Sequence, residues 1–190
     1  MRITKADVIQ TAADIADKNG LSNVSLKAVA ESLNIRTPSL YNHIDSLEAL
    51  LREIAHNGMK TMNERMMQAA IGKIGDDAIK SVGITYLNYM IEHPGIYETI
   101  QWATWHGTEE TGKIFDNYLS LLKTLALSCN FNPVNIDEIL NLLTGVLHGY
   151  TTLQLRYAFT KPNEVRTALS TALDTVLAGL HQKYDQHEKE

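Results

Sequence analysis

Apolar residues recur every three or four positions along most of the chain, which is the spacing of amphipathic α-helices and not the alternation typical of β-strands. Near the N-terminus, Thr4 is expected to cap a first helix, and Asn19-Gly20 is expected to end it, because glycine tolerates the left-handed backbone that follows many helices. The apolar face of that helix comprises Val8, Ala12, Ile15 and Ala16.

Two short helices are expected next, joined by a tight link around Asn34. Ser25 is the candidate cap of the first. Thr37 followed by Pro38 predicts a cap and the first helical position of the second, where proline is favoured. Two short helices packed on a preceding one form a helix-turn-helix, and its second helix enters the major groove of DNA.

Six longer helices are expected after this motif, and no strand. They span about residues 46–69, 76–91, 96–105, 109–127, 135–159 and 164–184. The predicted fold class is therefore all-α, with about nine helices. A three-helix helix-turn-helix domain at residues 1–58 precedes an antiparallel helical bundle at residues 59–190.

Composition and charge refine this interpretation. The net charge of −5 lies entirely in residues 61–190, because residues 1–60 hold seven Lys or Arg and seven Asp or Glu. Repulsion of DNA is therefore concentrated away from the predicted helix-turn-helix. A single cysteine, Cys129, excludes an internal disulfide and a multi-cysteine zinc site. With no signal peptide and no apolar run of about 20 residues, a cytoplasmic protein without membrane contact is expected.

The expected recognition helix has polar side chains without negative charge at the positions that the core does not need. These are Thr37, Ser39, Tyr41, Asn42 and His43. Such groups are the usual partners of phosphates and base edges. Polar residues on a short surface helix are also commonly only solvated, so the pattern as a whole, and no single residue, indicates binding to double-stranded DNA.

The segments 26–35, 38–44 and 47–51 resemble the DNA-binding domain of the tetracycline-repressor (TetR) family, most specifically in Ser-Leu-Tyr-Asn-His-Ile at 39–44. The resemblance covers about residues 4–55. Family members often carry Gly at the position of Asn34, and often Lys at that of Leu47; losing this cation implies one phosphate contact fewer. The resemblance implies phosphate contacts from Ser25, Lys27, Tyr41 and His43, and groove or base contacts from Thr37, Pro38, Ser39 and Asn42. Arg36 is a further DNA-binding candidate.

Residues 143–153 and 178–180 resemble the C-terminal domain of the TetR branch marked by a tryptophan- or leucine-His-Gly signature, here Leu147-His148-Gly149. The resemblance implies a homodimer formed by the last two helices, repression at a palindromic operator, and a small-molecule effector that changes the separation of the two DNA-binding heads. The apolar content of those two helices also favours a dimer, because it exceeds what one small domain needs inside.

Methionine and aromatic residues concentrate between residues 59 and 118, as is common in sites for small molecules. Few cations accompany them, so a neutral or weakly polar ligand is expected. Core packing is the competing interpretation of the same residues, and of His148. The candidate effector-binding residues are Met62, Met66, Tyr86, Met90, Tyr97, Trp102, Trp105, His106, Phe115 and His148.

Enzymatic function has little support in the sequence. His106, Glu109 and Glu110 have a spacing that a metal could use, but Gly107 weakens a helix between them. Cys129 has no nearby histidine in a recognisable motif, and no nucleophile elbow occurs. No catalytic residue, metal or cofactor is expected. The alternative function is a helical small-molecule-binding protein or enzyme with a vestigial helix-turn-helix, which would not shift duplex DNA in a gel.

Overall fold

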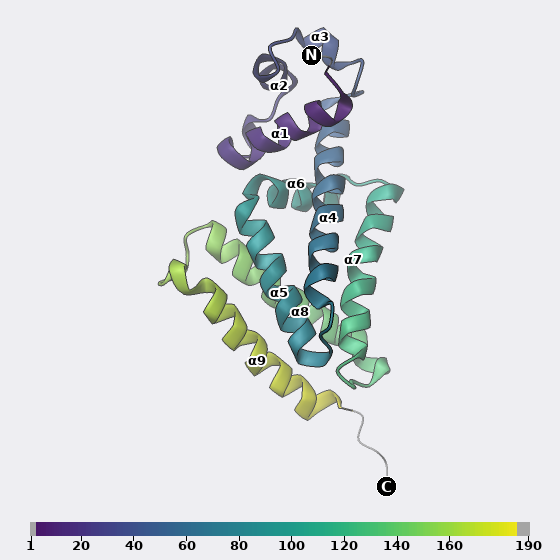
Figure 1. Cartoon of the computed structure of the whole chain (residues 1–190), viewed down its shortest axis with the longest axis vertical. Helices are drawn as coiled ribbons and strands as arrows, with labels where there is room; N and C mark the ends of the chain where they lie inside the picture. The colour runs from purple at the N-terminus through teal and green to yellow at the C-terminus, as the bar shows by residue number, and fades with distance from the viewer. Residues whose placement is uncertain (1–2, 186–190) are drawn as a thin grey trace. The chain divides into compact units, whose positions relative to one another are not determined.

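The structure, a computed structural model, describes residues 3–185, and these form two compact units. Unit 1 contains the chain up to Thr61 together with Glu92–Phe115, and unit 2 contains Met62–Ile91 together with the chain from Asp116 onward. The helices (Figure 1) are α1 (Lys5–Asn19), α2 (Leu26–Ser32), α3 (Thr37–Leu40), α4 (Leu47–Ala70), α5 (Gly75–Glu92), α6 (Pro94–His106), α7 (Glu109–Leu127), α8 (Ile136–Leu155) and α9 (Val165–Tyr184), with 3₁₀ turns at η1 (Leu21–Asn23), η2 (Pro133–Asn135) and η3 (Pro162–Glu164).

The all-helical expectation is confirmed for the part of the chain that the structure describes. The β-type pairing found there is one isolated bridge between Phe131 and Asp185. The expected extent of the eighth helix is wrong, because it ends at Leu155 and not near 159. Tyr157 adopts a left-handed φ of +53°, and the Ala158 amide donates to the Leu153 carbonyl at 2.9 Å, which closes the helix.

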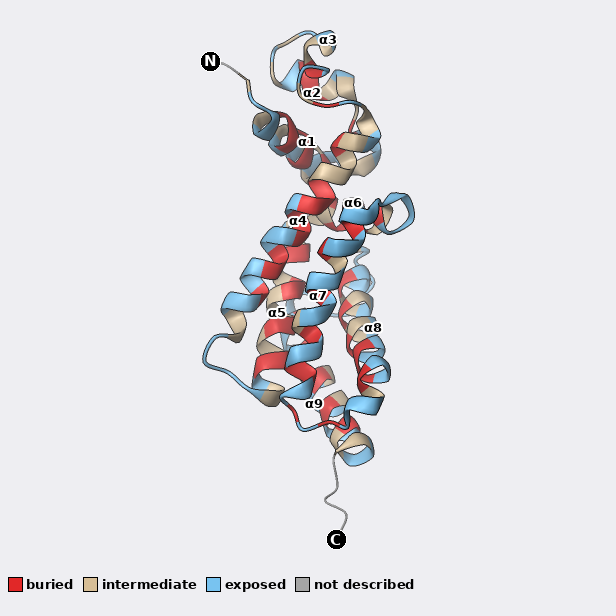
Figure 2. Ribbon diagram, turned by 90° about the vertical axis from the view of Figure 1, so that its right-hand side faces the viewer, coloured by how far each residue is buried: buried red, intermediate tan, exposed pale blue. Residues whose placement is uncertain are grey.

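Local sequence fixes the first helix of unit 1 as expected. The Thr4 hydroxyl accepts from the Asp7 amide, and the Asp7 carboxylate accepts from the Thr4 amide at 2.8 Å, so the two residues form a capping box. Gly20, with φ of +85°, follows the last residue of α1. The buried residues, red in Figure 2, form in this unit a core that includes Val8, Ala12, Ala16, Val29, Leu40, Leu50 and Ile54.

Unit 2 is built on apolar faces at helical spacing. Along α9 the buried positions are Val165, Leu169, Leu173, Leu177 and Leu180. The buried positions of α8 are Ile136, Ile139, Leu140, Leu143, Leu147 and Thr151. Most of the apolar residues that suggested an interface between two copies are therefore buried within one chain. Fewer apolar residues remain exposed for a dimer interface.

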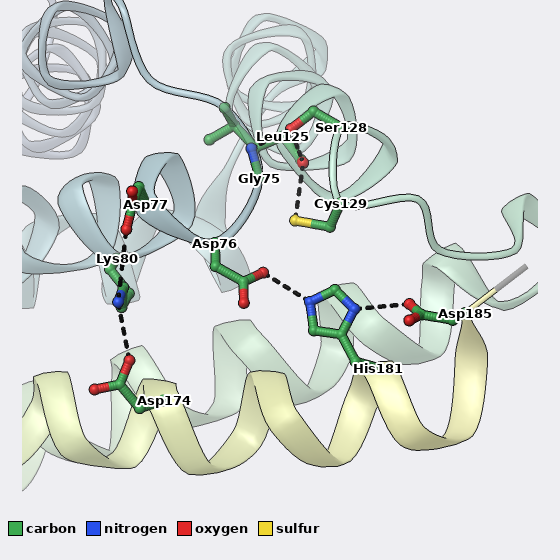
Figure 3. A network of polar contacts seen from close by, with 10 residues as sticks. All are labelled: Gly75, Asp76, Asp77, Lys80, Leu125, Ser128, Cys129, Asp174, His181 and Asp185. Carbon is green, nitrogen blue, oxygen red and sulfur yellow. Dashed lines mark hydrogen bonds and ion pairs between the residues drawn. The ribbon is translucent and has the colours of Figure 1, made fainter.

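A polar network joins the start of α5 to the end of α9 in unit 2 (Figure 3). The His181 ring lies between two carboxylates, with Nε2 2.9 Å from Asp76 Oδ1 and Nδ1 2.7 Å from Asp185 Oδ1. The hydrogen bond to Asp76, with that to Asp185, raises the pKa of His181 against the opposing effect of burial. Burial raises the pKa of the nearby Cys129 thiol to about 12, which keeps it protonated and a poor nucleophile.

This network predicts a pH-dependent stability. Because the pKa of His181 is raised in the folded state, its contribution is complete below pH about 6.5 and is lost as pH rises through the folded-state pKa. The melting temperature of the wild type should therefore fall from pH about 6 to about 9 relative to that of His181→Gln. Parallel curves for the two proteins across this range would contradict the assignment.

Candidate functional site

The helix-turn-helix of unit 1 is formed by α2 and α3 with a left-handed turn between them. Asn34 has a φ of +54°, and the Ile35 amide donates to the Ala30 carbonyl at 2.9 Å across the turn. Asparagine is the best substitute for glycine in this conformation, so the expectation that the turn survives with Asn34 is confirmed. Ser25 caps α2 as expected, since its hydroxyl accepts from the Ala28 amide at 3.1 Å.

The start of α3 differs from expectation by one residue. Arg36 is the N-cap and Thr37 the first helical residue, so the prediction that Thr37 caps this helix is wrong. Arg36 provides no side-chain cap, and Pro38 within the first turn supplies the fixed φ that starts the helix. Regular helix ends at Leu40, after which the backbone continues as turns to His43.

The expected DNA-contacting residues lie on the accessible side of this motif. Leu40 and Ile44 are buried and hold the segment against the core, which leaves its polar side chains outward. Tyr41 is 57% exposed although it is a large aromatic residue. The exposed members of the set are Lys27, Arg36, Pro38, Tyr41 and Asn42, and the half-buried members are Ser25, Thr37, Ser39 and His43.

The same unit contains a joint between α1 and α6 that the sequence did not indicate. The Asp17 carboxylate accepts from the backbone amides of Gly95 at 2.8 Å and Ile96 at 3.2 Å, and its other oxygen lies 2.9 Å from His93 Nδ1. Asp17 thus caps the N-terminus of α6, where a negative charge is favoured. A Cβ added at Gly95 would lie only 2.1 Å from the Ala16 carbonyl carbon, so the two backbones touch.

A second contact in unit 1 holds the first half of α4 to the start of α7. His56 is buried, and its Nε2 lies 2.8 Å from the Thr111 hydroxyl. Burial lowers the pKa of His56 despite the opposing Glu110 carboxylate, so the ring is neutral at pH 7. Nearby, Arg52 donates to the His106 carbonyl at 3.3 Å.

Unit 2 contains a small, partly open apolar cavity where four helices meet. The walls come from α5, α7, α8 and α9, and include Val82, Leu122, Leu147 and Leu173. A hydrogen-bonding group lies beside these walls, in which the Tyr86 hydroxyl is 3.3 Å from His148 Nδ1. The Tyr118 ring lies 6.4 Å from the Tyr86 ring. Unit 2 therefore combines apolar walls with a few polar groups, as small-molecule sites do.

Residues 79–176 match the family model described as the tetracyclin repressor-like, C-terminal domain, and this match covers more than half of the chain. YobS, an HTH-type transcriptional regulator of Bacillus subtilis (strain 168), is 31% identical over 179 residues, which are 94% of this chain and 93% of the relative. The chain belongs to the TetR family. It is a ligand-responsive, DNA-binding transcriptional regulator of the kind that this family comprises. The more specific resemblance to the leucine-His-Gly branch stays a prediction.

Solved structures of low identity support the TetR fold. A protein from Rhodococcus sp. RHA1 has a TM-score of 0.83 at 15% identity, covering 95% of this chain and 96% of that one. A variant of TetR from Acinetobacter baumannii AYE, in complex with minocycline, has a TM-score of 0.71 at 18% identity, covering 95% and 98%. Among residues 3–185, no helix is long and apolar enough to cross a membrane.

The ten effector-binding candidates of this TetR-family chain do not gather in one unit. Unit 2 holds Met62, Met66, Tyr86, Met90 and His148, whereas unit 1 holds Tyr97, Trp102, Trp105, His106 and Phe115. Trp105 is 87% exposed, because α6 buries Ile100 and Ala103 and carries Trp105 on the opposite side. His106 is exposed and stacks on Trp102, with ring centroids 4.6 Å apart. Tyr118 lies at the end of the stretch rich in methionine and aromatic residues but is not among the ten candidates. The cavity walls were not predicted, since leucines in a helix are typical of ordinary core.

The α1–α6 joint predicts that Gly95→Ala destabilises the protein by about 1–3 kcal/mol, because the added methyl meets backbone atoms that cannot move aside cheaply. Gly112→Ala is the matched control, since a Cβ at that exposed helical position meets no atom within 4 Å. The control should be neutral or stabilising by up to about 1 kcal/mol. Urea unfolding measures both changes, and equal stabilities of the two variants would contradict the close approach.

Proposed function

We propose that the chain is a cytoplasmic, dimeric repressor that occupies a pseudo-palindromic operator and is released by a small, uncharged, hydrophobic molecule. In this proposal, residues 1–58 bind DNA, and residues 59–190 bind the effector and form the dimer. The observation that carries the proposal is the exposed segment at 37–43, which lacks carboxylates and follows the left-handed turn at Asn34.

Each side of the recognition segment has a separate role in this proposal. Tyr41 and His43 contact phosphates, together with Ser25, Lys27 and Arg36, and these contacts position the protein without reading sequence. Thr37 and Asn42 read base edges, with Pro38 and Ser39 lying against the groove. The buried Leu40 fixes the segment from the inside, so the outward side chains are already oriented before DNA binds.

The two roles predict different effects of substitution. Tyr41→Ala or His43→Ala should weaken binding to all duplexes about equally and lower the salt dependence, because a phosphate contact is lost. Thr37→Ala or Asn42→Ala should mainly relax sequence preference, by about 1–3 kcal/mol for a good base contact. Operator sequences selected from a random pool allow both measurements by gel shift at several salt concentrations.

Asn57→Ala serves as the control, since Asn57 is exposed on α4, outside the recognition segment. Wild-type affinity and specificity in a variant carrying all four recognition substitutions would refute the assignment. Failure of the wild type to bind any duplex would instead favour a ligand-binding protein with a vestigial helix-turn-helix.

The outward face of α8 supports dimerisation through the last two helices. Leu142 and Leu153 on this face are 46% and 45% exposed, although both are large apolar residues. Between them, Gly145 and Gly149 leave open space where a Cβ would lie, and so does Gly179 on α9. Small residues flanked by exposed leucines allow the helices of a second copy to approach closely. Two recognition helices would then sit about 34–36 Å apart on the operator.

The dimer predicts a specific effect of bulk on this face. Gly145→Arg should convert the protein to a monomer and abolish operator binding while preserving the fold, because the new side chain meets no atom of its own chain at Cβ. Gly112→Arg on α7 is the matched control and should remain dimeric. Sedimentation velocity at micromolar concentration measures both. A dimeric Gly145→Arg, or a monomeric wild type, would contradict this interface.

A further inference from the structure

The cavity in unit 2 has walls without charge. All of its lining residues are aliphatic or glycine, and they come from α5, α7, α8 and α9. The space admits about one water molecule. An apolar cavity does not hold water favourably, because water there lacks hydrogen-bonding partners. The walls alone therefore select an apolar occupant, and an occupant larger than water requires the leucine side chains of the walls to move apart.

Three polar side chains without charge lie next to residues of the cavity walls, although they do not line the cavity. Tyr86 lies one helical turn after Val82 on α5, and Tyr118 lies one turn before Leu122 on α7, so each of the two tyrosines adjoins a wall residue. His148 on α8 belongs to this group through its contact with Tyr86. The Tyr86 and His148 rings meet edge to face with centroids 5.6 Å apart. Burial lowers the pKa of His148 and raises that of Tyr118 to about 12, which leaves both groups uncharged at pH 7.

The Tyr118 hydroxyl is the exceptional atom of this group. Only 4% of the residue's surface is exposed, and its oxygen has no hydrogen-bonding partner among residues 3–185. The nearby Thr144 hydroxyl opposes the rise in the pKa of Tyr118 but does not complete a hydrogen bond. Buried polar groups are almost always paired, because an unpaired one loses its hydration without compensation. An unpaired hydroxyl beside an apolar cavity is therefore suited to a ligand atom.

The polar groups near Leu125 already have partners within the chain. Leu125 lines the cavity, and its carbonyl accepts from the Ser128 hydroxyl and from the Cys129 thiol. The neighbouring network pairs His181 with Asp76 and Asp185 (Figure 3), so the hydrogen-bonding capacity there is already used within the chain. A ligand with one polar group would be oriented with that group toward Tyr118.

We propose that Tyr118, supported by the Tyr86–His148 pair, binds the polar head of the effector, and that the effector is an uncharged apolar molecule with one hydroxyl or carbonyl oxygen. Only the regulatory role of this ligand rests on the proposed function; the binding site does not depend on it. A carboxylate or phosphate head is excluded, because neither the cavity walls nor the neutral polar group supplies a cation to compensate the cost of burying its charge.

Three probes that share the same pentylbenzene body test the site on the full-length protein by calorimetry and thermal shift. 4-Pentylphenol carries a hydroxyl, pentylbenzene carries no polar group, and 4-pentylbenzoate carries a negative charge. We expect 4-pentylphenol to bind about 10-fold more tightly than pentylbenzene, and 4-pentylbenzoate to bind most weakly. Absence of binding by all three probes, or tightest binding of the benzoate, would overturn the proposal.

Tyr118→Phe removes only the unpaired oxygen. It should raise the melting temperature of the free protein, leave the affinity for pentylbenzene unchanged, and reduce the affinity for 4-pentylphenol about 10-fold. Tyr184→Phe is the matched control, since the Tyr184 hydroxyl donates to Glu138 at 2.7 Å, a contact remote from the cavity walls, and it should bind both probes as the wild type does. Equal phenol affinity in Tyr118→Phe and the wild type would indicate a hydroxyl satisfied by water and would overturn the assignment.

A gel shift with 4-pentylphenol separates this proposal from the proposed function. Binding with the expected dependence on Tyr118 supports the site whether or not the operator is released. If the operator binds but 4-pentylphenol does not release it, the ligand site holds and the assignment of its ligand as an effector is wrong. If the wild type binds no DNA, the proposed repressor function is wrong, and the calorimetry still decides the site.

Discussion

The Asp17 carboxylate carries the contact on which the arrangement of unit 1 depends. It accepts from two amides at the N-terminus of α6 and pairs with His93, and the glycine at 95 lets the backbone of α1 approach without a side chain between. The core of the helix-turn-helix continues from α1 into α2, α3 and α4, and Ile96 of α6 packs against it. α6 is consequently part of the body that presents the recognition segment, although some fifty residues separate the two in sequence.

This arrangement bears on how an effector in unit 2 would act. The chain passes between the two units after Thr61, after Ile91 and after Phe115. The first and last of these passages lie inside α4 and α7, and the second lies just before His93. A ligand regulates DNA binding only if it binds two shapes of the protein with different affinity.

The neutrality of the buried polar groups is a common feature of both units. His56 in unit 1 and His148 in unit 2 have lowered pKa values because burial disfavours the charged ring. By contrast, His181 lies near the surface between two carboxylates, which favour its charged form. The pKa values of these three histidines thus shift in different directions because their surroundings differ.

Local features were determined by the sequence. Thr4 and Ser25 cap α1 and α2, and Asn34 makes the left-handed turn. These features were predictable because each depends on residues within a few positions of one another. The lack of carboxylates at 37–43 is read directly from the sequence. The same holds for the TetR resemblance, which rests on a contiguous run of residues. Periodicity also marked the apolar faces of the long helices.

Contacts between distant residues were decided only by the tertiary structure. Nothing near Asp17 in the sequence indicates that it caps a helix starting at Pro94, and nothing near Trp105 indicates that it faces solvent while Tyr118 is buried. The sequence cannot distinguish Leu143, which packs inside its own chain, from Leu142, which is left outside. An apolar pattern indicates that one face of a helix is buried. Which partner covers that face, and which polar atom remains unpaired beneath it, follows only from how all the helices pack together.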